Sequence, residues 1–371
     1  MNLFPNLRKA YAEDHMSSHE AQRLSELIVW GPVVFQATRL MVKFGVLKAL
    51  RESAEGLTEA EVARQCDLSP YAAKVLLEAS LSIGTVIVNP ETERYMLTKA
   101  GWYLLVDPSH QVDMDFNHDV NYLGWFRMEE SLKEGRPAGL EHFGPWPTIY
   151  EGLSSLPEQV QKSWFGFDHF YSDNSFAEAL EIVFHQHKAR SLYDVGGNTG
   201  KWALQCVAFD PEVEVTILDL PQQIGLMKAN IAGKQGAERI KGCGINLLDS
   251  AALFPQRDGG LDAIWMSQFL DCFSEQEIVS ILRRARAAMT DDTRLYIMET
   301  FWDRQKYESA AFALTMTSLY FTALANGNSK MYHSDDMERL VREAGLEIEC
   351  IHDHIGYGHS IMVCKRIEEL K

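Results

Sequence analysis

The second half of the chain alternates apolar stretches with amphipathic ones, and this alternation limits the possible folds more than any other feature. Helical stretches separate the apolar runs, and one of them, 278–289, begins behind a capping box formed by Ser274 and Glu277. Apolar strands that alternate with helices are typical of a doubly wound parallel sheet. We therefore expect an α/β, Rossmann-like, seven-stranded sheet over residues 181–371. Its strands are expected at 191–195, 213–218, 240–245, 263–267, 295–299, 346–351 and 360–364.

A glycine-rich turn follows the first expected strand, in the sequence LYDVGGNTG at 192–200. Glycines such as Gly196 and Gly197 let a backbone approach a ligand closely, and the helix behind them presents free N–H groups. Asp194 precedes the glycines, where its carboxylate would repel a phosphate but suits a cationic amino group. Asp219 ends the second strand, and an acid in that place binds a ribose diol. An amino-acid cation plus a ribose, without phosphate, describes S-adenosylmethionine, whereas a nicotinamide cofactor favours the pattern G-x-G-x-x-G.

The first segment, residues 1–107, has the pattern of a mainly α winged-helix domain. Residues 29–51 are apolar at helical spacing and must be buried against another surface. A capping box at Thr58 begins one helix, and Ser69 before a proline begins the next. A hairpin then follows within 85–97. The side chains that we expect the second of these helices to turn inward are Ala72, Val75, Leu76 and Ala79.

Residues 108–180 form an irregular connector rich in aromatic side chains. Glycines and prolines interrupt it, so we expect helices joined by loops. The aromatic side chains fit two interpretations, a core packed between domains and a wall around an aromatic substrate, and the sequence supports both. They include Trp125, Phe126, Trp146, Trp164, Phe165, Phe167, Phe170 and Tyr171.

The charge of the chain restricts its partners. A formal charge of −17 at pH 7 repels nucleic acids and anionic membranes. The second helix of the winged-helix segment offers Lys74 against Glu78 and is otherwise mostly apolar, unlike a helix that reads DNA bases. We therefore expect neither a nucleic-acid partner nor a transcriptional regulator. No apolar run approaches the ~18–20 residues that span a membrane, and the polar N-terminus lacks a signal-peptide core, so we expect no membrane partner and a cytoplasmic location.

Cysteine and histidine patterns give no metal site. The six cysteines are scattered without a CxxC pair, which indicates reduced thiols in the core. The pairs His185/His187 and His352/His354 have a spacing that puts both rings on one face of a strand. A zinc site needs at least a third protein ligand, which neither pair has nearby in the sequence. We therefore expect no bound metal.

Three motifs carry a family resemblance when taken together. They are Asp194-Val-Gly-Gly, Asp219-Leu-Pro, and Asp262-Ala-Ile-Trp followed by Phe273-Ser-Glu. This set resembles the plant-type small-molecule O-methyltransferases and their bacterial relatives, which depend on S-adenosylmethionine. The resemblance covers almost the whole chain. It implies a dimerisation domain over 1–107 and hence a homodimer, a connector over 108–180 that contributes to the substrate pocket, and a methyltransferase domain over 181–371. The implied acceptor is a small hydroxylated molecule, aromatic or polyene-like.

The resemblance also implies a set of cofactor contacts. Asp194, Gly196 and Gly197 would hold the methionine part, and Asp219 the ribose. The remaining positions are Leu220 beside the adenine, Ser172 near the cofactor carboxylate, Asn246 with Leu247 in place of a Gly-Asp-Met-Phe-like motif, and Ser267 where many members have a lysine near the adenine. Asn246 would replace an acid of the family and would accept a hydrogen bond through its amide oxygen.

The chain departs from the family at the catalytic base. The family motif Leu-His-Asp-Trp-Ser-Asp contains the histidine that takes the acceptor's proton, and this chain has Leu-Asp-Cys-Phe-Ser-Glu at 270–275, with Asp271 in the histidine's place. A solvated aspartate with a pKa of ~4 is a weak base for a phenol of pKa ~10, but burial raises it. Asp271 is therefore the candidate catalytic residue. Glu299 matches one of the family's two orienting glutamates, and the second falls near Met331 and is missing.

Several alternatives remain open at this stage. Asp271 would also serve as a cap of the helix that begins near Ser274, or as a partner for a cationic group. In a further alternative, the acceptor ionises without help. His169, His333 and His359 are alternative bases from elsewhere in the chain. The missing histidine also keeps open a different enzyme on the same scaffold, one that binds the cofactor but catalyses decarboxylation, hydroxylation or ring closure.

Overall fold

The computed structural model describes residues 2–367 and divides the chain into two compact units. One unit is Asp14–Val120, and the other joins Met1–Glu13 to Asn121–Lys371. The expected connector 108–180 is therefore cut at residue 120, and most of it belongs to the same unit as the expected sheet. No helix within residues 2–367 combines the length and the hydropathy needed to cross a bilayer.

The unit Asp14–Val120 has the helix–turn–helix and hairpin of a winged helix. As expected, Thr58 begins one helix in a capping box with Glu61, and Ser69 caps the next. Leu57 pairs with Tyr95 beside the antiparallel hairpin. The elements are α2 (Ser18–Val29), α3 (Gly31–Lys43), α4 (Val46–Glu52), α5 (Glu59–Gln65), α6 (Pro70–Ile83), β1 (Val86–Asn89), β2 (Arg94–Leu97), α7 (Lys99–Val106) and α8 (Pro108–Asp115).

Helix α6 buries a face next to the one expected, and of the expected side chains Leu76 packs partly buried against the core. Ala73, Leu77 and Ser80 are buried, whereas Val75, which we expected inward, is 44% exposed. The helix sequence PYAAKVLLEASLSI is apolar around most of its circumference, so its periodicity does not select a face. Packing against α3, α5 and β1 decides which residues are covered.

The apolar stretch 29–51 is only partly buried within this unit. Met41, Leu47 and Leu50 belong to the core of the unit. Four neighbouring side chains at the end of α2 and the start of α3, called the α2–α3 patch below, are exposed instead: Ile28, Val29, Trp30 and Val33. A contiguous apolar patch of this kind is typical of an interaction surface.

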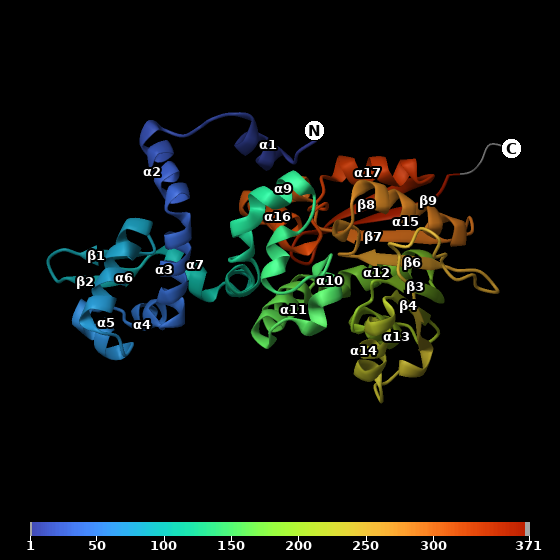
Figure 1. The fold of residues 1–371 in the computed structure, drawn as a ribbon, viewed down its shortest axis with the longest axis horizontal. Helices are drawn as coiled ribbons and strands as arrows, with labels where there is room; N and C mark the ends of the chain where they lie inside the picture. The colour runs from blue at the N-terminus through green and yellow to red at the C-terminus, as the bar shows by residue number, and fades with distance from the viewer. Residues whose placement is uncertain (1, 368–371) are drawn as a thin grey trace. The chain divides into compact units, whose positions relative to one another are not determined.

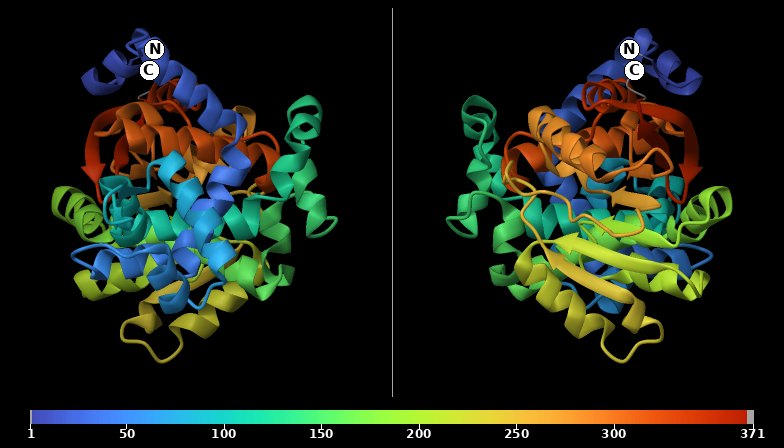
Figure 2. Two further views of the ribbon diagram at one scale, coloured as in Figure 1. Left: turned by 90° about the vertical axis from the view of Figure 1, so that its left-hand side faces the viewer. Right: turned by 90° about the vertical axis from the view of Figure 1, so that its right-hand side faces the viewer.

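The other unit contains a seven-stranded sheet in the order β5-β4-β3-β6-β7-β9-β8. The five strands from β5 to β7 in this order pair in parallel, and β9 runs antiparallel to both β7 and β8. The views in Figure 2 show β4 and β5 toward one edge and β8 and β9 at the other. The expected strands match within one or two residues, except that β8 continues further. They are β3 (Ser191–Val195), β4 (Glu214–Asp219), β5 (Ile240–Gly244), β6 (Ala263–Ser267), β7 (Arg294–Glu299), β8 (Leu346–Ile355) and β9 (His359–Arg366).

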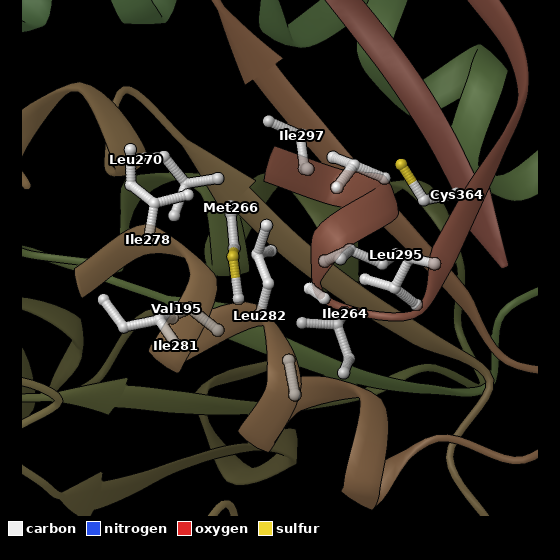
Figure 3. Packing of buried hydrophobic residues seen from close by; sticks show 14 of the residues in the cluster. Val195, Ile264, Met266, Leu270, Ile278, Ile281, Leu282, Leu295, Ile297 and Cys364 are labelled. Atoms are coloured by element: carbon white, nitrogen blue, oxygen red, sulfur yellow. The ribbon is translucent and has the colours of Figure 1, made fainter. Parts of the chain in front are cut away.

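Helices cover both faces of this sheet, as Figure 1 shows. On one face, α12 (Phe176–His187), α13 (Lys201–Phe209) and α14 (Pro221–Ile231) pack around Trp265 of β6. On the other face, α15 (Glu275–Ala288) and α17 (Ser334–Glu343) pack against Met266 and Ile297. Figure 3 shows this second core, where Leu282 of α15 meets the strand residues. Because successive strand residues point to opposite faces, β6 supplies both cores.

Four further helices of this unit lie in the expected connector and in the segment after β7, and all but the first carry aromatic residues. They are α9 (Met128–Glu134), α10 (Ile149–Gly152), α11 (Glu158–Asp173) and α16 (Glu308–Tyr320). The hydroxyl of Tyr320, at the end of α16, accepts a hydrogen bond of 2.7 Å from Nε1 of Trp164 on α11. This bond joins two segments that lie 156 residues apart in the sequence.

The N-terminal residues are fastened to the sheet-containing unit rather than to the unit that follows them in sequence. Helix α1 (Pro5–Ala12) buries Leu7 completely. The Asn2 side chain donates to Asp335 at 3.0 Å, and the Asn6 side chain donates to the carbonyl oxygen of Lys306 at 2.8 Å. These contacts, called the N-terminal clasp below, explain why Met1–Glu13 belongs to the unit with residues 121–371.

Candidate active site

The carboxyl ends of four parallel strands meet at one edge of the sheet. Strand β3 pairs in parallel with β4 and β6, and β6 pairs in parallel with β7. The segments at the ends of these strands carry the glycine-rich turn, Asp219, the turn 268–272 and Glu299, which therefore lie side by side. Doubly wound sheets bind their ligands at this edge, where the strand order reverses between β3 and β6.

Asp194 is a buried acid at the end of β3. It is 3% exposed, and its Oδ2 has no hydrogen-bond partner. Burial, and to a lesser extent the charge of Asp219, raises the pKa of Asp194 to about 8. A Cβ on Gly197 would lie 2.5 Å from that oxygen, and Gly196 has a φ of +73°. The turn thus needs its glycines, and the unsatisfied carboxylate oxygen suits an ammonium group.

Asp219 ties the glycine-rich turn to the end of β4. Its Oδ2 accepts the backbone N–H of Asn198 at 2.9 Å, and its Oδ1 accepts the N–H of Leu220 at 2.7 Å. Burial raises the pKa of Asp219, and these two N–H donors oppose the rise. Each carboxylate oxygen keeps a further lone pair. Asp219 can therefore bind the two hydroxyls of a diol while it holds the turn in place.

Asn246 lies in the loop after β5. Its amide oxygen accepts the backbone N–H of Leu248 at 3.0 Å, so the oxygen that we expected to replace the family's acid is engaged in its own loop. Leu247 is buried and belongs to the core that α15 and α17 cover. The cofactor roles of Asn246 and Leu247 stay predictions.

The remaining expected cofactor residues lie on three elements. Leu220 precedes the first residue of α14, and Ser267 ends β6 at the same sheet edge as Asp219. Ser172 lies on α11, where its hydroxyl donates to the carbonyl oxygen of Asp168 at 3.1 Å. This bond leaves the oxygen of Ser172 able to accept a further hydrogen bond. The cofactor roles of these three residues also stay predictions.

Glu299 supports the turn that follows β6. Its Oε1 accepts the backbone N–H groups of Phe269 at 3.0 Å and Leu270 at 2.8 Å, while Oε2 has no hydrogen-bond partner. Just before these residues, Gln268 has a left-handed φ of +45°, a conformation that costs ~1–3 kcal/mol in a non-glycine residue. Burial, together with the charge of Asp271, raises the pKa of Glu299 well above its usual range. Glu299 therefore positions the backbone of this turn.

Asp271 is buried in the same turn, the 3₁₀ segment Leu270–Cys272, and is 5% exposed. Its Oδ1 accepts a weak hydrogen bond from the Cys272 thiol at 3.4 Å. Burial, supported by the charge of Asp168, raises the pKa of Asp271 to about 7. Helix α15 is capped by Ser274 in its own capping box, so Asp271 is not the cap. A buried carboxyl group that titrates near neutral pH is suited to exchange protons with a ligand.

Sequence reasoning missed three side chains around Asp271. The charge of Asp271 acts on Tyr150 of α10 and on Tyr320 of α16, and both phenols have pKa values raised mainly by burial. The charge of Asp168 on α11 helps to raise the pKa values of Asp271 and Tyr320. One signal was present in the sequence, because Asp168 is a single acid within the aromatic run WFGFDHFY at 164–171.

Comparison with known proteins assigns this arrangement to a family. Residues 172–347 match the O-methyltransferase domain, and residues 22–95 match the Dimerisation2-like domain. Residues 172–347 are an O-methyltransferase domain. This methyltransferase is 23% identical over 335 residues to the O-demethylpuromycin-O-methyltransferase of Streptomyces alboniger. The aligned residues cover 90% of this chain and 86% of the relative.

Two further relatives show how the family varies. The L-tyrosine C(3)-methyltransferase of Streptomyces lavendulae is 24% identical over 326 residues, which cover 87% of this methyltransferase and 86% of the relative. The solved structure of the S-adenosylmethionine-dependent methyltransferase SibL in its apo form has a TM-score of 0.70, with 23% identity, and covers 92% of this chain and 98% of that one. The expected doubly wound α/β fold with a helical N-terminal domain is thereby confirmed.

The residues of this methyltransferase fit S-adenosylmethionine. The unsatisfied Oδ2 of Asp194 suits the ammonium of the methionine part, and Asp219 suits the ribose hydroxyls. Gly197 leaves no room for a Cβ beside Asp194, so the backbone approaches this place closely. The chain is an S-adenosylmethionine-dependent methyltransferase, and the expected decarboxylation or hydroxylation alternative has no support from the comparisons.

The three alternative histidine bases lie in different surroundings. His333 caps α17 and contacts the N-terminal clasp, because its Nδ1 accepts the N–H of Asp335 and its Nε2 lies 2.8 Å from the carbonyl oxygen of Asn2. His359 is fully buried at the start of β9, and burial lowers its pKa to about 4. His169 is the one next in sequence to Asp168, with its Nε2 3.9 Å from Oδ2. Of these three histidines, His169 is therefore the alternative that remains beside the Asp168–Asp271 region.

The histidine pairs are not arranged as a metal site in the part of the chain that the structure describes. His185 and His187 lie on helix α12 rather than on a strand, and residues two apart on a helix point to different sides. Among residues 2–367, no group of three or more His, Cys, Asp or Glu side chains is placed to hold a metal ion.

Proposed function

We propose that this methyltransferase transfers a methyl group to a hydroxyl oxygen of a small aromatic acceptor, with Asp271 as the general base. The observation that carries the proposal is the buried Asp271 carboxyl, whose pKa is raised to about 7, between the cofactor edge of the sheet and aromatic helices. An ideal catalytic base has a pKa near the working pH, because it must both be ionised and accept a proton. Asp271 meets this condition without the family's histidine.

Different residues are proposed to hold the cofactor and the acceptor. Asp194, Gly196, Gly197 and Asp219 would hold S-adenosylmethionine, which supplies an activated methyl group when bound. Asp271 would lie on the acceptor side, where its carboxylate takes the hydroxyl proton. Glu299 acts through the backbone, by holding the N–H groups of the turn that carries Asp271. Ser172, Leu220, Asn246, Leu247 and Ser267 are proposed to complete the cofactor site.

The acceptor pocket is proposed to lie among α10, α11 and α16. The hydroxyl groups of Tyr150 and Tyr320 are close enough to Asp271 for its charge to raise their pKa values further. Trp164 bonds to Tyr320 and fixes one part of this wall. Aromatic side chains of this kind exclude water and hold a flat ring. The expected connector thus contributes to the substrate pocket in this proposal.

We also propose a cytoplasmic homodimer in which the winged-helix unit carries the dimer interface. The match to a Dimerisation2-like domain at 22–95 and the exposed α2–α3 patch support this assignment. A two-fold dimer is the most common way to cover such a surface. The six cysteines are all free thiols, which is usual in a reducing compartment, although only Cys206 and Cys364 are buried in the core and Cys350 is exposed.

Calorimetric titration with S-adenosylmethionine and S-adenosylhomocysteine tests the cofactor half of this proposal. We expect micromolar binding to the intact chain and to Asp271→Ala, and loss of binding in Asp219→Ala. Glu212→Ala is the matched control, because Glu212 is an exposed acid beyond the opposite end of β4. No binding of either compound to the intact chain would overturn the proposal.

Product analysis tests the acceptor half. One relative is named as a C-methyltransferase, so the position of the new methyl group must be read from the product itself. We expect an O–CH₃ signal by nuclear magnetic resonance when phenolic compounds are screened with the cofactor. A methyl group found only on carbon would contradict transfer to oxygen and would leave the cofactor assignment intact.

A further inference from the structure

Three acids form a graded series from the inside of the site outward, called the acid series below. Glu299, at the end of β7, is 2% exposed, and Asp271 is 5% exposed. The side chain of Asp168 on α11 is 28% exposed. The charge of Asp271 helps to raise the pKa of Glu299, and the charge of Asp168 helps to raise the pKa of Asp271. Asp271 is therefore the neighbour of both other carboxyl groups.

No fixed positive charge balances this series. Within residues 2–367, no lysine or arginine forms an ion pair with Asp168, Asp271 or Glu299. Lys201 also acts on Asp168, but its ammonium group is bound to Asp173 at 2.8 Å. His169 lies 3.9 Å from Asp168, and burial lowers the pKa of His169, which disfavours the charged form of its ring. Burial raises the pKa of Asp168 to about 6, so Asp168 is mostly ionised at pH 7, whereas burial shifts Asp271 and Glu299 further toward their neutral forms. The charge of Asp168 is therefore the one in this series that lacks a partner.

A second observation points to a ligand in the same place. Oε2 of Glu299 is buried and has no hydrogen-bond partner, beside the turn that carries Asp271. Trp164 and Tyr320 stand next to Asp168 and Asp271, and aromatic faces also favour cations.

We propose that the acceptor is an aromatic compound with a positively charged nitrogen, which is held by Asp168 at the outer end of the acid series. Its hydroxyl then faces Asp271, which takes the proton. This inference rests on the proposed function, because it names the acceptor class of the same site. Asp168 is a specificity-determining residue in this proposal, and the aromatic wall accommodates the ring between the two polar ends.

Three phenols with the same ring and different side-chain charge test the proposal. They are tyramine, which is cationic, para-ethylphenol, which is neutral, and para-hydroxyphenylpropanoate, which is anionic. Binding to the chain saturated with S-adenosylhomocysteine is measured by calorimetry. We expect tyramine to bind about tenfold or more tightly than para-ethylphenol, and the anionic phenol to bind least.

Asp168→Asn should reduce the preference for tyramine to below about threefold while leaving the affinity for para-ethylphenol unchanged. Asp168→Glu keeps the charge and should keep the preference. Glu158→Gln is the matched control, since Glu158 is an exposed acid at the start of the same helix. Thermal melting and the affinity for S-adenosylhomocysteine verify that each variant is folded.

The outcomes separate this inference from the proposed function. If S-adenosylhomocysteine fails to bind the intact chain, both the proposed function and the proposed acceptor class are contradicted. If it binds but the three phenols bind equally, or tyramine does not bind at millimolar concentration, the charge preference is overturned and the methyltransferase assignment stands. A preference for tyramine that survives in Asp168→Asn would overturn the role of Asp168.

Discussion

At the scale of single residues, the site is built from carboxyl groups that burial shifts toward neutral pH. Asp194 and Asp271 have pKa values raised to about 8 and about 7, and the pKa of Glu299 is raised well above its usual range. The cause in each case is mainly the loss of water around the charged form. The three acids nevertheless differ in their hydrogen bonds, because Glu299 holds two backbone N–H groups and Asp194 leaves an oxygen unsatisfied. Their proposed roles differ accordingly.

Replacing Asp271 by asparagine removes the proposed base and keeps its shape. We expect kcat/KM to fall by about a hundredfold or more, as is usual when a general base is lost. In the unmodified chain, kcat/KM should rise with pH through about 7, because only the ionised carboxylate accepts a proton. Asp271→His restores the family's base and should move the rise of kcat/KM toward about pH 6.5. Steady-state kinetics across pH with an acceptor found by screening measure both effects.

Asp258→Asn is the control for this series, since Asp258 is an exposed acid away from the turn that carries Asp271. Its pH profile should match that of the unmodified chain. If Asp271→Asn keeps the full rate at every pH, the acceptor ionises without help and Asp271 is not the base.

Asp194→Asn should stabilise the cofactor-free chain at alkaline pH while it weakens cofactor binding. Because the folded-state pKa of Asp194 is raised above the unfolded value, its contribution to stability is full below about pH 4 and is lost as pH rises through about 8. The asparagine variant avoids this loss. Urea unfolding at about pH 5 and about pH 8.5 should therefore show a gain that grows with pH, on the order of a few kcal/mol at the higher value. A gain that is equal at both pH values would contradict the account.

At the scale of elements, two irregular segments decide where functional groups lie. The left-handed Gln268 redirects the chain at the end of β6, and Glu299 then fixes the N–H groups of the following turn. Asp271 is thereby buried instead of following a regular strand–helix connection. The N-terminal clasp is the second such segment, since a short helix returns to α17 and to the segment after β7.

Leu7→Ala tests the clasp. Leu7 is fully buried, so its truncation should lower the free energy of unfolding by about 2–4 kcal/mol. Arg8→Ala, at the exposed neighbouring position of α1, is the control and should change it by less than about 0.5 kcal/mol. Chemical unfolding followed by tryptophan fluorescence measures both. Equal stabilities of the two variants would show that the clasp contributes little.

At the scale of the whole molecule, the residues of the candidate active site and the proposed dimer interface belong to different units of the chain. The acids of the site belong to the unit that contains residues 121–371, and the exposed α2–α3 patch belongs to the unit Asp14–Val120. A change in the patch should therefore alter the oligomeric state without touching the residues of the site.

Trp30→Asp with Val33→Asp should convert the proposed dimer into a monomer. Both side chains are more than half exposed, and a charge there would be costly to bury in an interface. Lys48→Ala, at an exposed position of α4, is the control and should leave the dimer intact. Light scattering coupled to size-exclusion chromatography gives the mass. A monomeric unmodified chain at micromolar concentration, or a dimeric double variant, would contradict the assigned interface.

The sequence by itself determined the order and the ends of the strands, the capped helices, and the position of Asp194, Asp219 and Asp271 in their motifs. These features are local, because apolar runs, capping residues and glycine turns act over a few neighbouring residues. The inward face of α6 was not determined, since that helix is apolar nearly all round and packing chooses the face.

Only the tertiary structure decided how Asp271 is buried and which groups surround it. Its neighbours Tyr150, Asp168 and Tyr320 come from three helices far apart in the sequence, and a pKa depends on the water that such neighbours exclude. The structure also showed that the amide oxygen of Asn246 accepts a hydrogen bond within its own loop. The burial and the ionisation of a side chain depend on its surroundings in the folded protein, so no sequence motif could have predicted them.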